Sequence, residues 1–381
     1  MEWSEHAFNH LETLTRNIED PRDRVYVLYP IGEIIFLVIA ANLCGIESWR
    51  GIELFGERRL SWLRKYLPFR DGVPSRFTIA RIFSIIRPAY FEALIGEVGN
   101  IVKEKNRENS DSISNIIAID GKTLCSASKI KQSPLHLLNA ISTEDGIVLS
   151  QVKCFDKSNE ITAIPYILET LQLTGATVTM DAIACQKSIV KKIRKLGGDF
   201  VIPVKENQPA LFRAVSTYFE YTGLTPENSQ YFYETVEKSR GRVEKRSYQI
   251  AYRPQEPIFK LWTGVHSIAM AISEVFRNGV PTSEVRYFIS SLEPNPGKIA
   301  RAIRSHWSVE NRLHWVLDVV FNEDRDIKRK NHAPRNYAAI RKIAINLIRG
   351  YLGRTTGVKE ARMLAALDPE QMEKILNHTF S

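Results

Sequence analysis

Two acidic residues follow buried, strand-like runs at matching places in the chain. Asp120 comes directly after the apolar run NIIAI of residues 115–119, and Asp181 comes directly after ATVTM of residues 176–180. If these strands lie parallel and adjacent, both carboxylates project from the same edge of the sheet, where open α/β sheets bind their ligands. Two carboxylates a few ångströms apart repel each other unless a cation lies between them. A hard divalent cation such as Mg²⁺ or Mn²⁺ meets that need.

The best candidate for a third acidic ligand is Glu310, in the run SHWSVENRLHWVLDVVF. We predict a helix from about residue 298 to 321, because apolar residues recur there with helical spacing. This apolar stripe comprises Ile303, Trp307, Val309, Leu313, Val316, Leu317 and Val320. Glu310 lies at the edge of the stripe, so its carboxylate can face the end of the sheet. Three carboxylates on a strand–strand–helix framework are typical of a two-metal site for phosphoryl transfer.

Three residues near these acids carry side chains suited to phosphate. Lys122 lies two residues beyond Asp120, and Lys205 and Asn207 follow the strand expected over residues 199–204. Ammonium and amide groups donate hydrogen bonds to phosphate oxygens. Solvated loop residues have the same composition, so both interpretations stay open.

Two histidines and a tryptophan surround Glu310 in the sequence. His306 and His314 lie four residues before and after it, on the same face of the expected helix. We expect His306 to contact a phosphate or a carboxylate and His314 to pack in the core, since imidazole suits Zn²⁺ better than Mg²⁺. Trp307 can stack on an unpaired base, but its place in the apolar stripe favours core packing.

Residues 1–105 are expected to form a helical, DNA-binding domain. A core helix is expected over residues 32–46, because its apolar run IIFLVIAA is too short to span a bilayer. A basic helix over 50–66, a Gly/Pro turn and a helix over 76–86 capped by Ser75 suit a helix-turn-helix module. An ordinary helical bundle has the same pattern.

A polar linker over residues 101–114 is expected to precede a mixed α/β core of residues 115–205. Further elements predicted in this core are strands over 135–142, 146–155 and 199–204 and helices over 163–173 and 186–196. A β-rich insertion follows over residues 206–298, with strands expected over 231–236, 244–252, 267–275 and 284–292. Residues 299–381 hold the helix that bears Glu310 and a basic helical tail.

The chain is basic, with a formal net charge of +9, which favours polyanionic partners and nucleic acid first. Two basic runs suit contacts with the DNA backbone: residues 239–246, which include Arg240 and Arg242, and residues 324–342 of the tail. The four cysteines form no CxxC pair, so we expect free thiols rather than a zinc site or disulfides. The N-terminal residues lack the basic start and apolar run of a signal peptide.

Six ordered sequence blocks resemble a single family. They are NIIAIDGK (115–122), KSNEITAIP (157–165), VTMDAIACQ (178–186), GGDFVIPVKENQ (197–208), RYFISSL (286–292) and HWSVENRLHWVLDVVFNED (306–324). These blocks are similar to the DDE transposases of ISAs-type bacterial insertion sequences, also known as H-repeat-associated proteins. The resemblance covers nearly the whole chain. It implies an RNase H-like core in which Asp120, Asp181 and Glu310 match the family's acidic triad and bind two Mg²⁺ or Mn²⁺ ions.

The resemblance further implies a transposase that cleaves and joins double-stranded DNA at the terminal repeats of its element and at a target site. Such a protein acts as a homo-oligomer on DNA, with no membrane partner, in the bacterial cytoplasm at the nucleoid. Two alternatives stay open. A DNA-binding relic or repressor of its own element would keep the basic surfaces without metal-dependent cleavage. A structure-selective nuclease would cleave strands without joining them.

Overall fold

The computed structural model combines helices with a nine-stranded mixed sheet. It describes residues 18–23, 25, 27–108, 115–124, 134–154, 160–223, 231–239, 242–277, 280–352 and 357–380. The strand order is β3-β2-β1-β4-β5-β9-β8-β7-β6. The chain divides into two compact units, one formed by Met1–Ile113, Gly121–Lys157 and Glu310–Ser381 and the other by Ser114–Asp120 and Ser158–Val309. Each unit therefore combines segments that the expected domain boundaries separate.

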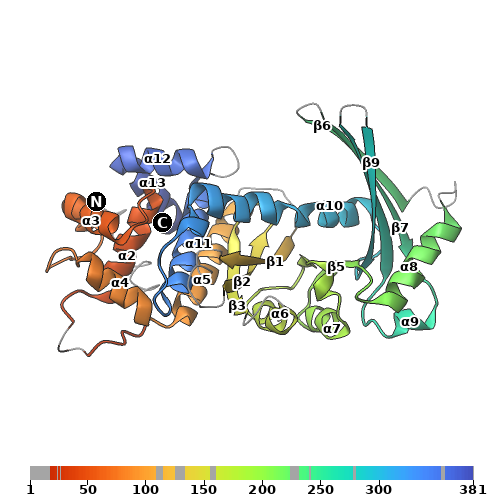
Figure 1. The fold of residues 1–381 in the computed structure, drawn as a ribbon, viewed down its shortest axis with the longest axis horizontal. Helices are drawn as coiled ribbons and strands as arrows, with labels where there is room; N and C mark the ends of the chain where they lie inside the picture. The colour runs from red at the N-terminus through yellow and green to blue at the C-terminus, as the bar shows by residue number, and fades with distance from the viewer. Residues whose placement is uncertain are drawn as a thin grey trace. The chain divides into compact units, whose positions relative to one another are not determined.

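The first unit is largely helical (Figure 1). Its α-helices are α2 (Ile31–Leu43), α3 (Trp49–Leu63), α4 (Arg76–Ile85), α5 (Pro88–Glu108), α11 (Ala333–Leu352), α12 (Val358–Leu367) and α13 (Pro369–Phe380). Every residue of α2 from Glu33 to Leu43 is buried, which confirms the predicted core helix. Over the stretches that the structure describes, no helix is long and apolar enough to cross a membrane.

Serine side chains begin two of these helices. The hydroxyl of Ser48 accepts a hydrogen bond of 3.0 Å from the backbone N–H of Gly51 at the start of α3. The hydroxyl of Ser75 accepts one of 3.3 Å from the N–H of Thr78 at the start of α4. Such caps satisfy amide groups that have no partner within the helix. The predicted helices over 50–66 and 76–86 are thus confirmed, with the serine cap of the second.

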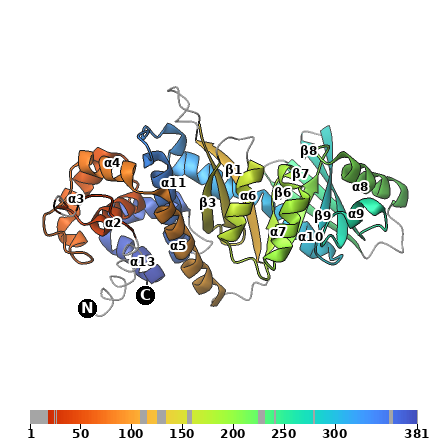
Figure 2. The ribbon, with the colours of Figure 1, turned by 90° about the horizontal axis from the view of Figure 1, so that it is seen from below.

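Helix α5 corrects the expected linker over residues 101–114, because it continues to Glu108. It lies against α11 and against strand β3 (Val148–Cys154), which pairs with β2 (Leu135–Ser142) (Figures 1 and 2). A Cβ atom at Gly99 would lie 2.6 Å from the carbonyl oxygen of Val148, so only glycine permits this close approach. Asn346 of α11 hydrogen-bonds both the N–H and the carbonyl of Val148, each at 2.7 Å. The edge strand is therefore covered rather than open to a further strand.

The basic tail is mostly internal, so the prediction that residues 324–342 face DNA is wrong for several of its basic side chains. Arg341 is 2% exposed and lies 2.7 Å from the carboxylate of Asp326 and 3.1 Å from that of Glu47. Lys328 pairs with Asp326 at 3.1 Å and lies 3.7 Å above the ring of Tyr337. Buried charges require such partners, because an unpaired charge away from water is strongly unfavourable.

Two further basic side chains of this run have internal partners. Lys342 is buried and donates to the amide oxygen of Gln151 at 2.6 Å. Arg335 forms a two-pronged pair with Glu92, at 2.6 and 2.8 Å. The sequence shows only a run of cations, whereas their burial depends on polar and acidic partners that lie far away along the chain.

The second unit contains two parallel strand pairs and an antiparallel extension. Its strands are the start of β1 (Ile116–Leu124), β4 (Thr177–Thr179), β5 (Asp199–Val204), β6 (Phe232–Ser239), β7 (Arg242–Tyr252), β8 (Ser267–Arg277) and β9 (Val280–Ser290). Strand β4 pairs in parallel with both β1 and β5, and β9 pairs antiparallel with β5. The four strands of the β-rich insertion are thus confirmed, and they extend the core sheet rather than forming a separate one.

Helices cover this part of the sheet. They are α6 (Glu160–Glu169), α7 (Lys187–Lys195), α8 (Pro209–Thr222), the short α9 (Pro257–Lys260) and α10 (Pro296–His306). Helices α6 and α7 lie side by side, while α8 packs on β8 and β9 and α10 contacts β4 to β7 (Figures 1 and 2). Helix α8 lies inside the segment that was expected to be β-rich, where no helix was predicted. Its rings Phe212 and Phe219 pack against Tyr287 of β9.

We predict that Arg341→Met lowers the free energy of unfolding by about 3–5 kcal/mol, because it leaves the carboxylates of Glu47 and Asp326 buried without that cation. Arg335→Met, at a pair nearer the surface, should cost about 1 kcal/mol or less. Urea unfolding of both variants measures the difference. A cost for Arg341→Met no larger than that of the control would show that the buried ion pairs do not stabilise α11.

The effect of Arg341→Met should depend on pH. Burial raises the pKa of Asp326, but the charges of Arg341 and Lys328 outweigh it and the net pKa lies below the usual value. A lowered pKa gives stability that is present above the unfolded-state pKa of about 3.9 and is lost as the pH falls through the folded-state value. The difference in the free energy of unfolding between wild type and Arg341→Met should therefore become smaller below about pH 4.

Candidate active site

Asp120, on β1, and Asp181, two residues after the end of β4, occupy matching places relative to two neighbouring strands. Strands β1 and β4 run parallel, and the last residues paired are Ala118 and Thr179. Each acid lies two residues beyond that pair along its own strand direction. Residues at equivalent positions of parallel neighbours point to the same face of a sheet. The condition on which the sequence analysis depended, two parallel and adjacent strands, is therefore met.

Three basic residues, His306, Lys205 and Arg286, lie near the side chain of Asp181, which is 68% exposed. Nε2 of His306 lies 3.7 Å from Oδ1 of Asp181, so the expected carboxylate contact of His306 is present. His306 is the main cause of a lowered pKa at Asp181; partial burial raises this pKa, and the charges of Lys205 and Arg286 lower it further. Asp181 therefore stays ionised at neutral pH and can bind a cation.

The loop after Asp181 is held by two amide side chains from the end of β5. Nδ2 of Asn207 donates to the carbonyl of Ala182 at 2.8 Å, and Nε2 of Gln208 donates to the carbonyl of Cys185 at 2.9 Å. Sequence reasoning proposed Asn207 as a phosphate donor and missed Gln208. The adjacency of β4 and β5 is the signal that could have identified both as supports for this loop.

The helical segment that carries Glu310 changes its winding. Helix α10 ends at His306, and the chain continues in two π-helical turns, Glu310–His314 and Val316–Val320. The predicted helix over residues 298–321 is thus correct in extent, but it is not α-helical throughout. π-Helical turns are rare and occur frequently at functional sites.

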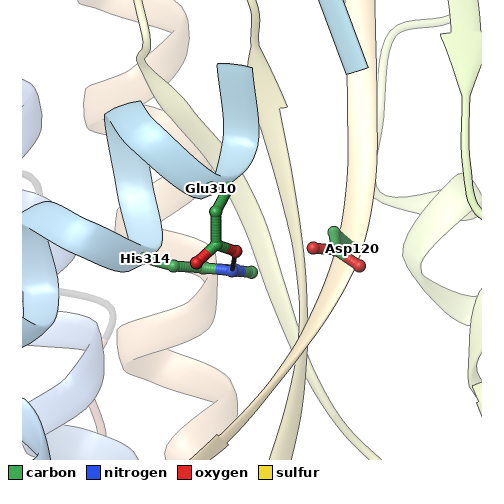
Figure 3. A group of neighbouring side chains, drawn as sticks. All are labelled: Asp120, Glu310 and His314. Atoms are coloured by element: carbon green, nitrogen blue, oxygen red, sulfur yellow. Dashed lines mark hydrogen bonds and ion pairs between the residues drawn. The ribbon is translucent and has the colours of Figure 1, made fainter. Parts of the chain in front are cut away.

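His314 fixes the carboxylate of Glu310. It is 6% exposed, and its Nδ1 lies 3.1 Å from Oε2 of Glu310 (Figure 3). An ionised carboxylate only accepts hydrogen bonds, so Nδ1–H of His314 is the donor. His314 is buried as expected, and in addition it restricts the orientation of an otherwise exposed acid.

Glu310 and His314 are candidate metal ligands on the helical segment of the first unit (Figure 3). The carboxylate of Glu310 suits a hard cation, and the imidazole nitrogen suits transition metals. The other two acids of the expected triad belong to the second unit. There, Asp120 lies on β1, and Asp181 lies two residues after the end of β4.

Comparison with known proteins assigns the chain to a family. Residues 111–347 match the family model described as Transposase DDE domain, and residues 12–97 match the one described as DDE_Tnp_1-associated. The chain belongs to the DDE-domain transposases. This confirms the resemblance drawn from the six sequence blocks.

Two relatives from Escherichia coli K12 align along most of their length. The "H repeat-associated putative transposase YhhI" is 38% identical over 372 residues, which cover 94% of this chain and 95% of the relative. The "Putative protein YbfL" is 39% identical with the same coverage. A solved piggyBac transposase synaptic complex with hairpin DNA has a TM-score of 0.42 at 12% identity, covering 100% of this chain and 78% of that one, which is too low to establish a common fold.

The structure places Lys122 in an ion pair. Its Nζ lies 2.6 Å from Oδ1 and 2.7 Å from Oδ2 of Asp318, and its side chain is largely buried. A phosphate would have to compete with this carboxylate for the ammonium group. Lys205, in contrast, is exposed and lies close enough to Asp181 to affect its pKa.

Trp307 is 49% exposed, so the expected core packing is wrong. The α-helix ends just before it, and the 3.6-residue period that placed it in the apolar stripe stops there. Arg286 of β9 lies 4.6 Å above its ring, a cation–π contact, and is held on its other side by Glu284 at 2.7 Å. Arg286 is a candidate site residue that sequence reasoning missed, because β9 is distant in the chain.

Two expected DNA contacts have no described side chain. Arg240 lies outside the described residues. Arg242 begins strand β7, opposite Ser239 on one side and Arg277 on the other. Their role in DNA binding stays a prediction.

We predict that His306→Gln raises the pKa of Asp181 toward the usual value of about 3.9, because it removes the main cause of the lowered pKa. Lys205→Gln, the control, should raise it less. The carboxyl ¹³C signal of Asp181, identified by its loss in Asp181→Asn, reports the titration. An unchanged pKa in His306→Gln would contradict the assigned cause.

Proposed function

We propose that this DDE-family transposase cleaves and joins DNA strands with two divalent ions, Mg²⁺ or Mn²⁺, held by Asp120, Asp181 and Glu310. The observation that carries the proposal is the parallel register of β1 and β4, because Asp120 and Asp181 each follow the last residue pair, Ala118 and Thr179, by two residues. The restraint of the Glu310 carboxylate by His314 within the first unit supports it. Carboxylate oxygens are the donors that these hard cations prefer.

The sheet order supports an RNase H-like core. Strands β3-β2-β1-β4-β5 follow one another, with β2 and β3 antiparallel and β1, β4 and β5 parallel. In this proposal β6 to β9 are an insertion that continues the core sheet beyond β5. They carry Arg286 to the neighbourhood of Asp181.

The proposed chemistry is two successive in-line displacements. In the first, a water oxygen attacks a DNA phosphorus, the bond from phosphorus to the 3′ oxygen breaks, and a free 3′-hydroxyl remains. In the second, that hydroxyl attacks a target phosphorus and displaces another 3′ oxygen, so strands are joined without external energy. Bound metal ions would lower the pKa of the nucleophile and neutralise the leaving oxygen. The chain's own residues position the ligands: His314 orients Glu310, and the Asn207 and Gln208 amides support the Asp181 loop.

The N-terminal helices are proposed to recognise the terminal repeats. Helix α4 exposes Arg76, Phe77 and Arg81 on one side, and Phe77 is 71% exposed beneath the Arg76 guanidinium. Exposed arginine side chains can donate to DNA phosphates, and an exposed aromatic ring beside them can stack on a base. Assembly as a homo-oligomer on DNA is part of the same proposal.

We predict that His314→Leu lowers cleavage about 10- to 100-fold, as expected when a group that orients a metal ligand is removed. His314→Asn keeps an N–H donor near the position of Nδ1 and should restore part of the activity. The metal concentration for half-maximal cleavage should rise in His314→Leu and less in His314→Asn. Equal behaviour of the two variants would show that His314 acts through packing alone.

We predict that Asp120→Asn, Asp181→Asn and Glu310→Gln each abolish Mg²⁺-dependent cleavage of DNA that carries the element's terminal repeats. Binding of that DNA should remain, because the changes remove metal ligands and not cations. Near-wild-type cleavage by any variant would remove that residue from the site. Binding without cleavage by the wild-type chain would favour the relic or repressor, and cleavage without strand joining would favour the nuclease.

A further inference from the structure

Helix α7 begins shortly after the Asp181 loop and has two contrasting faces. Its buried face consists of Ile189, Val190 and Ile193, and the helix packs against α6 and β5 (Figure 2). The opposite face exposes Lys187, Lys191 and Lys195, which recur every four residues. We call these three side chains the lysine row.

The other two cations of α7 have acidic partners. Lys192 pairs with Glu169 of α6, and Arg194 pairs with Asp199 at the start of β5. Among the described residues, no acid forms an ion pair with a member of the lysine row. The uncompensated positive charge of this helix is therefore concentrated on its solvent face.

The lysine row is electrostatically unfavourable for the isolated fold. Like charges four residues apart repel each other on a helix surface. A cation in the first turn also opposes the helix dipole, and the first turn of α7 contains no acid. Exposed helices that serve only solubility usually alternate charges, so this arrangement indicates an anionic partner.

We infer that the lysine row binds the phosphate backbone of DNA along α7, on the path that leads away from Asp181. Three lysines spaced by one helical turn extend over about 12 Å, which is the axial length of roughly three to four phosphates of one strand. The first of them follows Asp181 by only six residues, across the short loop that Asn207 and Gln208 hold. This inference rests on the proposed function and adds to it a backbone contact beside the cleavage site.

An anionic membrane is the less suitable partner. A helix that lies in a membrane surface needs an apolar face to insert among the lipids. The apolar residues of α7 are buried within the protein, so its exposed face has charge without apolar area. DNA backbone contacts need only the charge.

The test is the salt dependence of binding to a random-sequence DNA duplex by the full-length chain. The variant is Lys187→Gln/Lys191→Gln/Lys195→Gln. The control is Lys298→Gln/Lys359→Gln/Lys374→Gln, which removes the same charge from exposed lysines elsewhere. The slope of log K against log salt is negative, and each lost phosphate contact reduces its magnitude by about 0.9. The magnitude should therefore fall by about 2.7 in the lysine-row variant and by less than about 1 in the control.

Two further measurements distinguish DNA binding from a structural role of the lysine row and from a membrane contact. The melting temperature of the lysine-row variant should equal or exceed that of wild type, because like-charge repulsion is removed; a lower value with weaker binding would mean a structural role and overturn the inference. Loss of binding to phosphatidylserine vesicles with DNA binding kept would overturn it in favour of a membrane contact. An unchanged slope, or an equal loss in the control, would also overturn it.

Failure of this inference is distinguishable from failure of the proposed function. Wild-type cleavage in Mg²⁺ is measured separately, and its absence would contradict the transposase chemistry while the salt slopes still decide the role of the lysine row. If the wild-type chain cleaves DNA but the lysine-row variant has the salt slope of wild type, the proposed chemistry stands and the DNA backbone contacts lie elsewhere on the protein.

Discussion

The parallel pairing of β1 with β4 is the constraint on which the candidate site depends. Only three residue pairs define it, and a shift by one residue would turn one acid to the opposite face of the sheet. A backbone hydrogen bond of 2.8 Å from Thr177 to Asn115 extends this pairing, and one of 2.8 Å from Asp199 to Ala176 extends the pairing of β4 with β5. Buried side chains such as Val178 on β4 add a packing requirement. The short strand is therefore fixed by both neighbours, and the positions of Asp120 and Asp181 follow from it.

The acids differ in how the protein balances their charge. Asp181 faces His306, Lys205 and Arg286, which together keep it ionised. Glu310 is exposed but restrained by a buried histidine. Neutralising an acid entirely within the protein, as Lys122 does for Asp318, removes its capacity to bind a cation. When neighbouring groups balance only part of its negative charge, the acid stays both oriented and anionic. A divalent ion requires both conditions.

Sequence reasoning succeeded where periodicity is local and failed where the outcome depends on distant partners. Strands β2 and β5 begin and end where the pattern predicts, and Asp120 and Asp181 follow from it. Trp307 was misplaced because an α-helical period was extended across a change of winding. The hydrogen bond from Asn207 to the carbonyl of Ala182 was not predicted, because it joins the end of β5 to a loop that follows another strand. Arg286 was missed because antiparallel strands bring it back from a remote part of the chain.

The basic surplus of the chain shows why net charge alone does not locate a nucleic-acid surface. Arg341 and Lys328 are cations of the tail, yet they balance buried acids and are shielded from any polyanion. A cationic side chain contributes to DNA affinity when it neutralises a phosphate and releases the counterions condensed on the DNA, so only side chains that are exposed and without an acidic partner count fully. On α7 the pairs with Glu169 and Asp199 remove two charges from this set and leave the solvent face wholly positive. Exposed charge that has no acidic partner and destabilises the fold is therefore a better guide to the binding partner than the net charge of the chain.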